Sequence, residues 1–423
     1  MSFVHFDEAK KAAEKQIQKW LNDTPQVEKA LIVWDLLGKC RLALWAAPPI
    51  DTHSLEQILK AECQAWWSGD LFRIMEADKV TQLLYNETWE QARARNSKLA
   101  IVDRHRSRTM WFQNQDAPIW QAPDDGPPII VFYSFKGGLG RSTLLASFAI
   151  QRARMGDRVC VLDFDLDSPG VGNFLSSDAS GLTANWGIVD FLLESDEKDA
   201  PLYEYHHRCD RIAGKGEISV FPVGNINESY TDKLARVDME TDSKLGFEKL
   251  LLRIQKELRP QWILIDARTG LSASTGLLLS GIAHLHVILG TAQEQSWQGL
   301  NLVITRCGKE RIESGQMQSD MILVHAMVPV GTYGDKDHEH FMARSEKEFS
   351  ERYYASHESD KDNLWSTNDM ESSQAPHTPA RVDYDPRLAS FGDVEQVADA
   401  LCQASYSSIA ERISDQFREE ENT

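Results

Sequence analysis

Apolar and polar residues follow two different patterns in the two parts of the chain. Upstream of residue 113, helical and strand-like stretches are mixed, and the strand-like runs are rich in Leu, Ile, Val and Trp. The predicted helices span 7–21, 54–67 and 78–95, and the predicted strands span 30–34, 41–45 and 99–102. Residues 113–127 are rich in Pro, Asp and Gly, a composition typical of a linker. The pattern predicts a mixed α/β N-terminal module over 1–113 and a linker over 114–128.

From residue 129 onward, short apolar runs alternate with helical periodicity. Several runs are too apolar to be half-exposed, which is typical of parallel strands covered on both faces. These strands are predicted at 129–133, 159–162, 218–222, 262–265, 286–289 and 321–324. We expect a doubly wound, mostly parallel α/β sheet over 129–423, with ligands at the carboxyl ends of its strands. The polar stretch 333–380 is expected to be an insertion, part helix and part loop, and 393–420 an acidic amphipathic helix.

Charge and composition narrow the class of protein. The formal net charge is −19, and acids and bases balance over residues 1–120, so the excess of acids lies downstream. Such an acidic body is repelled by nucleic acid and by anionic membrane surfaces. No apolar stretch approaches the ~20 residues that a membrane-spanning helix needs, and the N-terminus has no signal-peptide core. Six cysteines without a C-x-x-C pair fit reduced thiols, so we expect a cytoplasmic protein with no membrane partner.

The segment FKGGLGRST follows the first strand of the second part and precedes a predicted helix. Its glycines are Gly137, Gly138 and Gly140. They let backbone N–H groups converge on phosphate oxygens, Ser142 is placed to ligate Mg²⁺, and Thr143 is placed to reach a phosphate oxygen. The ordinary phosphate loop, G-x-x-x-x-G-K-[ST], has glycine where Phe135 stands and lysine where Arg141 stands. A glycine-rich turn without a ligand would look similar, so the other motifs matter.

Two further motifs carry acids at the ends of predicted strands. Asp163 and Asp165 lie in the segment VLDFDLDSPG, and Asp266 and Gly270 lie in WILIDARTG. Buried acids at the carboxyl end of a parallel strand are costly unless a cation or a water needs them. An aspartate there can hold the shell of Mg²⁺, and the glycine N–H can sense a γ-phosphate.

The order K-G-G-x-G-[KR]-S-T, then D-x-D, then D-x-x-x-G resembles the MinD/ParA family of deviant Walker A ATPases, over roughly residues 129–395. The resemblance implies ATP and Mg²⁺ as ligands and a homodimer with two ATP molecules between the subunits. Lys136 matches the lysine that reaches the partner's nucleotide, Arg141 takes the place of the loop lysine, and Asp165 matches the aspartate that orients the attacking water. The same resemblance places the metal at Ser142, Asp163 and Asp266, and the nucleotide at Gly137, Gly138, Leu139, Gly140, Arg141, Ser142, Thr143 and Gly270.

Three hypotheses of function follow. The first is an ATPase switch that hydrolyses ATP slowly, dimerises with ATP and signals to an unidentified protein through residues 1–113. The second is a hydrolysis-deficient nucleotide-binding scaffold, because the planar guanidinium of Arg141 is not the point charge of a lysine. The third is a DNA-partitioning or DNA-associated ATPase, including one of a defence system, which would bind DNA through the basic run 93–108. For that run we favour a solvated face; its basic residues are Arg93, Arg95, Lys98, Arg104, Arg106 and Arg108.

Overall fold

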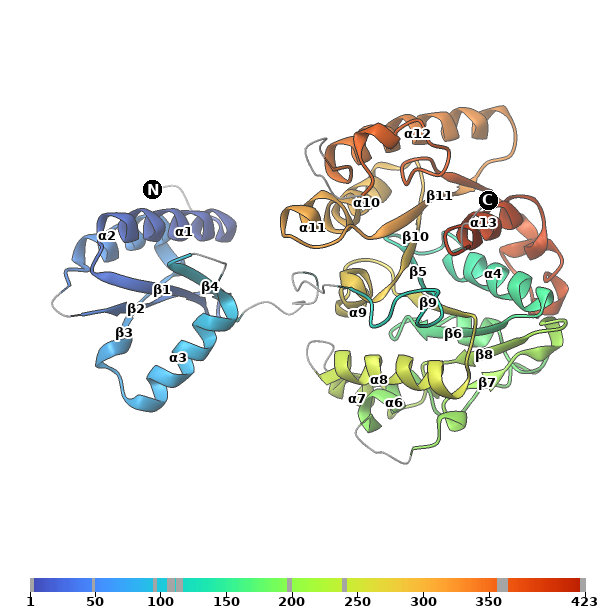
Figure 1. The fold of residues 1–423 in the computed structure, drawn as a ribbon, viewed down its shortest axis with the longest axis horizontal. Coiled ribbons are helices and arrows are strands. Elements are labelled where there is room, and N and C mark those ends of the chain that lie inside the picture. The colour runs from blue at the N-terminus through green and yellow to red at the C-terminus, as the bar shows by residue number, and fades with distance from the viewer. Residues whose placement is uncertain are drawn as a thin grey trace. The chain divides into compact units, whose positions relative to one another are not determined.

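The chain folds into two compact units, Met1–Ser107 and Arg108–Thr423, each with its own hydrophobic core (Figure 1). The computed structural model describes residues 4–47, 50–93, 97–104, 111, 117–195, 200–237, 242–355 and 364–418. The two units are treated separately below.

The N-terminal unit is built on a four-stranded mixed sheet with the strand order β3-β2-β1-β4. β1 and β2 are antiparallel, whereas β1 with β4 and β2 with β3 are parallel. The strands are β1 (Val27–Trp34), β2 (Cys40–Ala46), β3 (Trp67–Arg73) and β4 (Leu99–Asp103), and the helices are α1 (Phe6–Asp23), α2 (His53–Cys63) and α3 (Lys79–Ala92). Apolar residues of α1 and α2 pack on one face of the sheet and those of α3 on the other.

The predicted helix over 54–67 is wrong in its last turn. The helix ends at Cys63, Gln64 has a positive φ of 47°, and Trp67 begins strand β3. The β3 sequence WSGDLFR has no clear alternation of apolar and polar residues, so the sequence pattern concealed this edge strand. The two neighbouring tryptophans therefore lie on different elements, and the indole N–H of Trp66 donates to the carbonyl of Val4 at 2.9 Å.

The second unit confirms the predicted doubly wound α/β sheet. Its eight strands have the order β12-β11-β10-β5-β9-β6-β8-β7, and all neighbours are parallel except β7 and β8. The strands are β5 (Ile129–Ser134), β6 (Arg158–Phe164), β7 (His207–Arg208), β8 (Glu217–Phe221), β9 (Trp262–Ala267), β10 (Leu285–Gly290), β11 (Asp320–Val328) and β12 (Ala380–Asp383).

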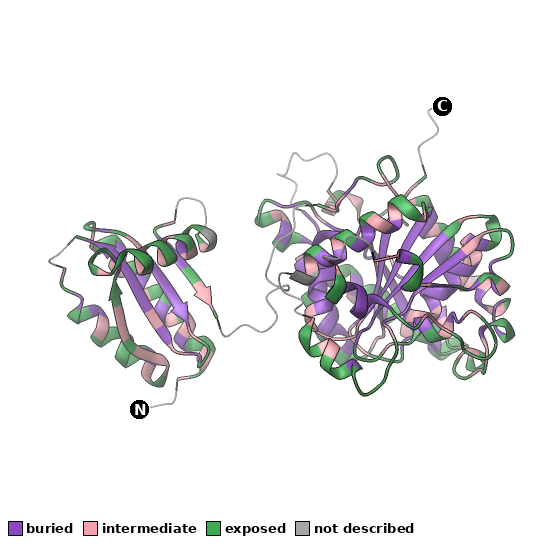
Figure 2. Cartoon of the chain, turned by 90° about the horizontal axis from the view of Figure 1, so that it is seen from below, coloured by how far each residue is buried: buried purple, intermediate pink, exposed green. Residues whose placement is uncertain are grey.

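Helices cover both faces of this sheet, and the strands lie buried between them (Figure 2). Alternate residues of β5 show the two faces: Ile129, Val131 and Tyr133 belong to one core cluster, and Ile130 and Phe132 to the other. The helices are α4 (Arg141–Met155), α5 (Val171–Phe174), α6 (Ile188–Glu194), α7 (Tyr230–Arg236), α8 (Asp242–Glu257), α9 (Ala273–Leu277), α10 (Glu294–Cys307), α11 (Lys309–Glu313), α12 (Thr332–Arg352) and α13 (Ala404–Asp415). α4 and α13 pack on the Phe132 face, and α6, α8, α10 and α12 on the opposite face.

The C-terminal helix is shorter than predicted. Within 393–420, the structure has two short 3-10 turns, Val394–Gln396 and Ala400–Cys402, before α13 begins. Asp393 caps the first turn by accepting a hydrogen bond from the N–H of Glu395, so the chain turns where the sequence pattern predicted a continuous helix. Among the described residues, no helix has both the length and the apolar character to cross a membrane.

Candidate functional site

Strand register brings the two acidic motifs together at one edge of the sheet. β9 lies between β5 and β6, and Asp266 of β9 pairs directly with Asp163 of β6. Both side chains are buried. Because the strands are parallel, the residues that follow each of them meet at the same edge, next to the loop that follows β5.

The glycine loop joins β5 to α4 and borders open space. Gly138 and Gly140 have φ of 76° and 80°, a left-handed conformation that side chains rarely adopt. A Cβ added at Gly137, Gly138 or Gly140 would meet no atom within 4 Å. The backbone N–H groups of such a loop, at the N-terminus of a 15-residue helix, suit an anionic ligand.

Arg141 lies buried at the start of α4 between two acids. Its Nη2 donates to Asp165 Oδ2 at 3.1 Å, and its Nε donates to Asp266 Oδ1. Burial alone would lower the pKa of Arg141, but the carboxylates of Asp266 and Asp165 outweigh it and raise the pKa. The third nitrogen, Nη1, is buried and has no hydrogen-bond partner among the described residues. An unsatisfied buried donor is destabilising, and a phosphate oxygen would satisfy it.

Asp163 and Asp165 are in a site that disfavours the charge of their carboxylates. Burial and the neighbouring Asp266 raise the pKa of Asp163 to about 7. Its carboxylate accepts hydrogen bonds from the backbone N–H groups of Gly172 at 2.9 Å and Gly170 at 3.1 Å. Burial also raises the pKa of Asp165, although Arg141 opposes that shift. A bound cation would stabilise the charged form of these acids.

Ser142 supports a magnesium site in this arrangement. Its Oγ donates to Asp266 Oδ2 at 2.5 Å, which joins the start of α4 to the end of β9. The described residues contain no cluster of three or more His, Cys, Asp or Glu side chains suited to a metal ion. One hydroxyl, one or two carboxylates and the oxygens of a bound phosphate are, however, a ligand set that Mg²⁺ commonly takes. The residues present therefore fit a polyphosphate bound with Mg²⁺.

The first two residues of the loop rest on α10. Lys136 Nζ donates to Gln293 Oε1 at 2.7 Å, immediately before the helix begins. The ring of Phe135 lies against Gly299, and Phe135 is not one of the three described non-glycine residues with positive φ. The sequence pattern did not point to Gln293 or Gly299, because both are distant in sequence and neither belongs to a motif.

The D-x-x-x-G loop is tied to its neighbours on both sides. Gly270 has a φ of 71°, and its carbonyl accepts a hydrogen bond from the hydroxyl of Tyr133 at 3.1 Å. Arg268 forms an ion pair with Asp167 of the D-x-D loop. This pair links the two acidic loops, and sequence analysis did not single out either residue.

The remaining predicted residues fall into two groups. Leu139 is buried in the core on the α4 face, and Thr143 lies half-buried in the first turn of α4. In the basic run, Arg93 forms an ion pair with Glu90 at 2.8 Å. Arg95, Arg106 and Arg108 lie outside the described residues, so the nucleic-acid hypothesis stays a prediction.

Comparisons with known proteins give structural similarity without sequence similarity. No protein-family model matches the sequence, and no curated protein matches it. A putative plasmid partition protein from Borrelia burgdorferi B31 bound to AMPPNP covers 69% of this chain and 100% of its own, with 12% identity and a TM-score of 0.44. A ParA family ATPase from Chlorobium tepidum TLS covers 68% of this chain and 99% of its own, with 16% identity and a TM-score of 0.44. The similarity to the septum site-determining protein MinD from Pyrococcus horikoshii OT3, complexed with Mg-ADP, covers 69% of this chain and 95% of that protein, with 16% identity and a TM-score of 0.42.

Proposed function

We propose that the chain is an ATP-binding switch that uses Mg²⁺, hydrolyses ATP slowly and dimerises when ATP is bound. One observation carries the proposal. The buried Nη1 of Arg141 has no partner among the described residues, and it belongs to the first residue after a glycine loop that borders open space. An anion with several oxygen atoms would satisfy both the guanidinium and the loop N–H groups.

Each residue of the site then has a task. The loop N–H groups and Arg141 would hold the phosphates, and Thr143 would reach a phosphate oxygen. Ser142, Asp266 and Asp163 would hold the shell of Mg²⁺, which would neutralise charge on the phosphates. Asp165 would orient the attacking water, and the N–H of Gly270 would sense the γ-phosphate.

Nucleotide binding is tested by titrating a fluorescent ATP analogue with Mg²⁺ into the full chain. Wild type and Arg158→Ala should bind equally, because Arg158 is an exposed arginine at the other end of β6. Arg141→Ala should weaken binding at least tenfold, because it removes the buried guanidinium. Equal affinity of all three proteins would overturn the proposal.

The contact between Arg141 and Asp165 favours slow hydrolysis. One oxygen of Asp165 accepts from Arg141, and the other accepts from the backbone N–H of Ser168 at 3.2 Å. These two contacts fix the orientation of the Asp165 carboxylate, and the charge of Arg141 makes it a weaker acceptor for an attacking water. Phosphate release should be measured for wild type and Asp165→Ala: a large loss in the variant supports hydrolysis, whereas equal rates favour the non-hydrolysing scaffold.

Lys136 supports the dimer. Its side chain is half-buried, and its ammonium group donates to Gln293 Oε1 in a solvent-exposed hydrogen bond, so the ammonium group is accessible to a second subunit. Wild type should be monomeric with ADP and dimeric with ATP in light scattering. Lys136→Ala should remain monomeric with ATP while its nucleotide affinity changes little. A dimer that is indifferent to ATP would remove this part of the proposal.

Helix α3 of the N-terminal unit supports a protein partner. Val80, Leu83 and Leu84 are 76%, 62% and 53% exposed and follow each other at helical spacing. An exposed apolar stripe of this kind is typical of a protein-binding surface. Capture of partners by the full chain with ATP and with ADP tests this, with Leu83→Asp as the variant expected to lose the ATP-dependent partner and Glu87→Gln as its control. A partner retained by Leu83→Asp would exclude α3 as the docking surface.

A further inference from the structure

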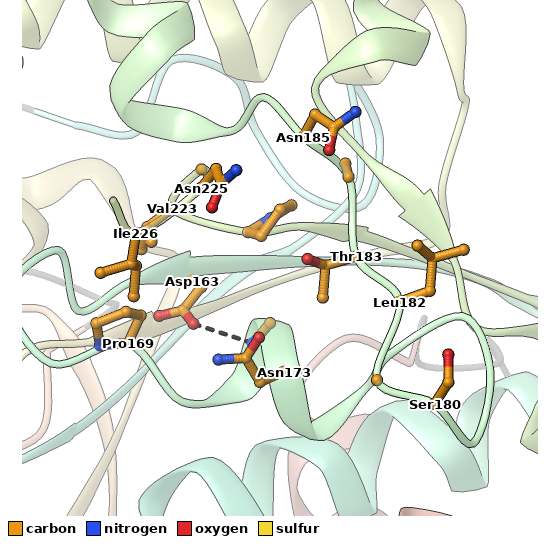
Figure 3. A pocket seen from close by; sticks show the side chains of 15 residues that line it. Asp163, Pro169, Asn173, Ser180, Leu182, Thr183, Asn185, Val223, Asn225 and Ile226 are labelled. Atoms are coloured by element: carbon orange, nitrogen blue, oxygen red, sulfur yellow. Dashed lines mark hydrogen bonds between the residues drawn. The ribbon is translucent and has the colours of Figure 1, made fainter. Parts of the chain in front are cut away.

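A cavity of about 480 Å³ lies beside Asp163, and no residue of the glycine loop lines it (Figure 3). It is bordered by the residues after β6 and after β8, and by the segment 180–185. Its position at the carboxyl ends of parallel strands is where doubly wound folds bind ligands. Its volume is within the range of about 300–1,000 Å³ typical of small-molecule sites.

The wall of the cavity is held in place by hydrogen bonds. The N–H of Ser177 donates to the carbonyl of Leu182 at 2.8 Å, and the N–H of Ala184 donates to His207 Nδ1 at 3.2 Å. A Cβ at Gly187 would lie 2.1 Å from the carbonyl oxygen of Pro222, so this glycine allows the wall to approach the end of β8 closely. The cavity is therefore a built feature of the fold.

Four polar side chains from three segments surround the opening without partners. They are Asn173, Thr183, Asn185 and Asn225. No hydrogen bond joins any of these four side chains to another described residue, so their donors and acceptors are available to a ligand. Convergent polar groups of this kind fix the orientation of a small molecule.

The charges and apolar groups of the cavity define the ligand further. Among the described residues that line it, none is Lys, Arg or His, and Asp163 is the one charged residue. Both oxygens of Asp163 accept backbone N–H groups. An anionic ligand would therefore meet no cationic side chain here, and a neutral ligand is favoured. Leu182 and Ile226, 59% and 58% exposed, offer apolar contact from opposite sides of the cavity (Figure 3).

We infer that this cavity binds a neutral nucleoside, whose base edge hydrogen-bonds to the asparagine carboxamides and whose ring packs against Ile226, while Leu182 borders the opposite side of the cavity (Figure 3). A carboxamide presents a donor and an acceptor side by side, the pattern that base edges complement. The hydroxyls of the ribose suit Thr183 and the remaining asparagine. This inference uses no residue of the phosphate loop, and Asp163 is the one lining residue that the cavity shares with the proposed magnesium site.

The test titrates adenosine, guanosine, cytidine and uridine separately into the full chain and measures the affinity of each by calorimetry. Nucleosides have no phosphates, so the phosphate loop gives them little affinity. We expect one or more of the four to bind wild type, and Asn185→Leu and Asn225→Leu each to weaken that binding about tenfold. Asn22→Leu, on α1 of the other unit, is the matched control and should leave it unchanged.

Two further measurements make the outcome decisive. Arg141→Ala should lose ATP but keep the nucleoside, which separates this site from the proposed ATP site. Retained ATP binding by the two cavity variants shows that they are folded. Absence of binding by all four nucleosides, undiminished binding by both cavity variants, or loss of the nucleoside with Arg141→Ala would overturn the inference.

Discussion

The aromatic ring of Phe135 occupies the space that a side chain at Gly299 would need: a Cβ at Gly299 would lie 1.9 Å from Phe135 Cγ. Gly299 is in the interior of α10, where glycine is usually destabilising by about 1 kcal/mol relative to alanine. The Phe135 ring therefore explains why a glycine stands at position 299 inside a helix. Phe135 stands where the ordinary phosphate loop has glycine, and the helix beside it has a glycine that makes room for the ring.

Gly299→Ala should destabilise the second unit by about 1–3 kcal/mol, because the added methyl group displaces the Phe135 ring. In the Phe135→Ala background the same change should be neutral or stabilising, since the clash is gone. Urea unfolding of the four proteins gives the coupling energy. Additive effects of the two changes would show that the contact has no energetic role.

Arg141→Lys should bind Mg²⁺ and ATP but hydrolyse ATP several-fold faster than wild type. A lysine keeps the positive charge, but its single ammonium does not reproduce the fork that joins Asp165 to Asp266. Asp165 would then be free to orient water. Single-turnover phosphate release measures the chemical step, and a rate equal to or below that of wild type would contradict this account.

In the nucleotide-free chain, the free energy of unfolding should depend on pH through the protonation of Asp163. Its pKa is raised from 3.8 to about 7 in the folded chain, so the folded state holds the proton more tightly than the unfolded state between these values. The stabilisation from that proton is present at low pH and is lost as the pH rises through 7. The free energy of unfolding of wild type, taken relative to Asp163→Asn, should fall by about 2–3 kcal/mol from pH 5 to pH 8. Urea unfolding at both pH values checks this, and a constant difference would contradict it.

Asp167→Asn should increase affinity for ATP several-fold, because it releases Arg268 from an ion pair close in sequence to Gly270, the residue proposed to sense the γ-phosphate. The pair is partly exposed, so its loss should change the free energy of unfolding by less than about 1 kcal/mol. Asp232→Asn, which breaks a more exposed pair with Arg236 on α7, is the control and should change neither quantity. Unchanged affinity in Asp167→Asn would show that Arg268 does not reach the nucleotide.

The pattern of apolar residues along the chain predicted the central strands of the second unit. The central strands are continuous apolar runs because both of their faces are covered, as in Ile129–Ser134 and Trp262–Ala267. Strand β3 was missed because an edge strand with Ser, Gly and Asp has little apolar signal. The predicted terminal helix was too long because the caps that interrupt it are single polar side chains.

The candidate site likewise has parts that the sequence predicts and parts that it does not. Motifs of adjacent residues identified the loop and the acids, and strand register then brings Asp163 and Asp266 together. The partners of those residues come from distant segments: Gln293 holds Lys136, Gly299 receives Phe135, and Arg268 pairs with Asp167. Such contacts depend on the tertiary arrangement, and a single sequence contains no local signal for them.

The attachment of Phe135 and Lys136 to α10 has a thermodynamic consequence. Phe135 contacts α10, and Lys136 contacts the residue immediately before it. A ligand that displaces the loop would therefore disturb both contacts. Coupling free energies are reciprocal. If the loop's ligand changes the affinity of the outer surface of α10 for a partner, that partner changes the loop's affinity for its ligand by the same factor; Leu302, 53% exposed, lies on α10.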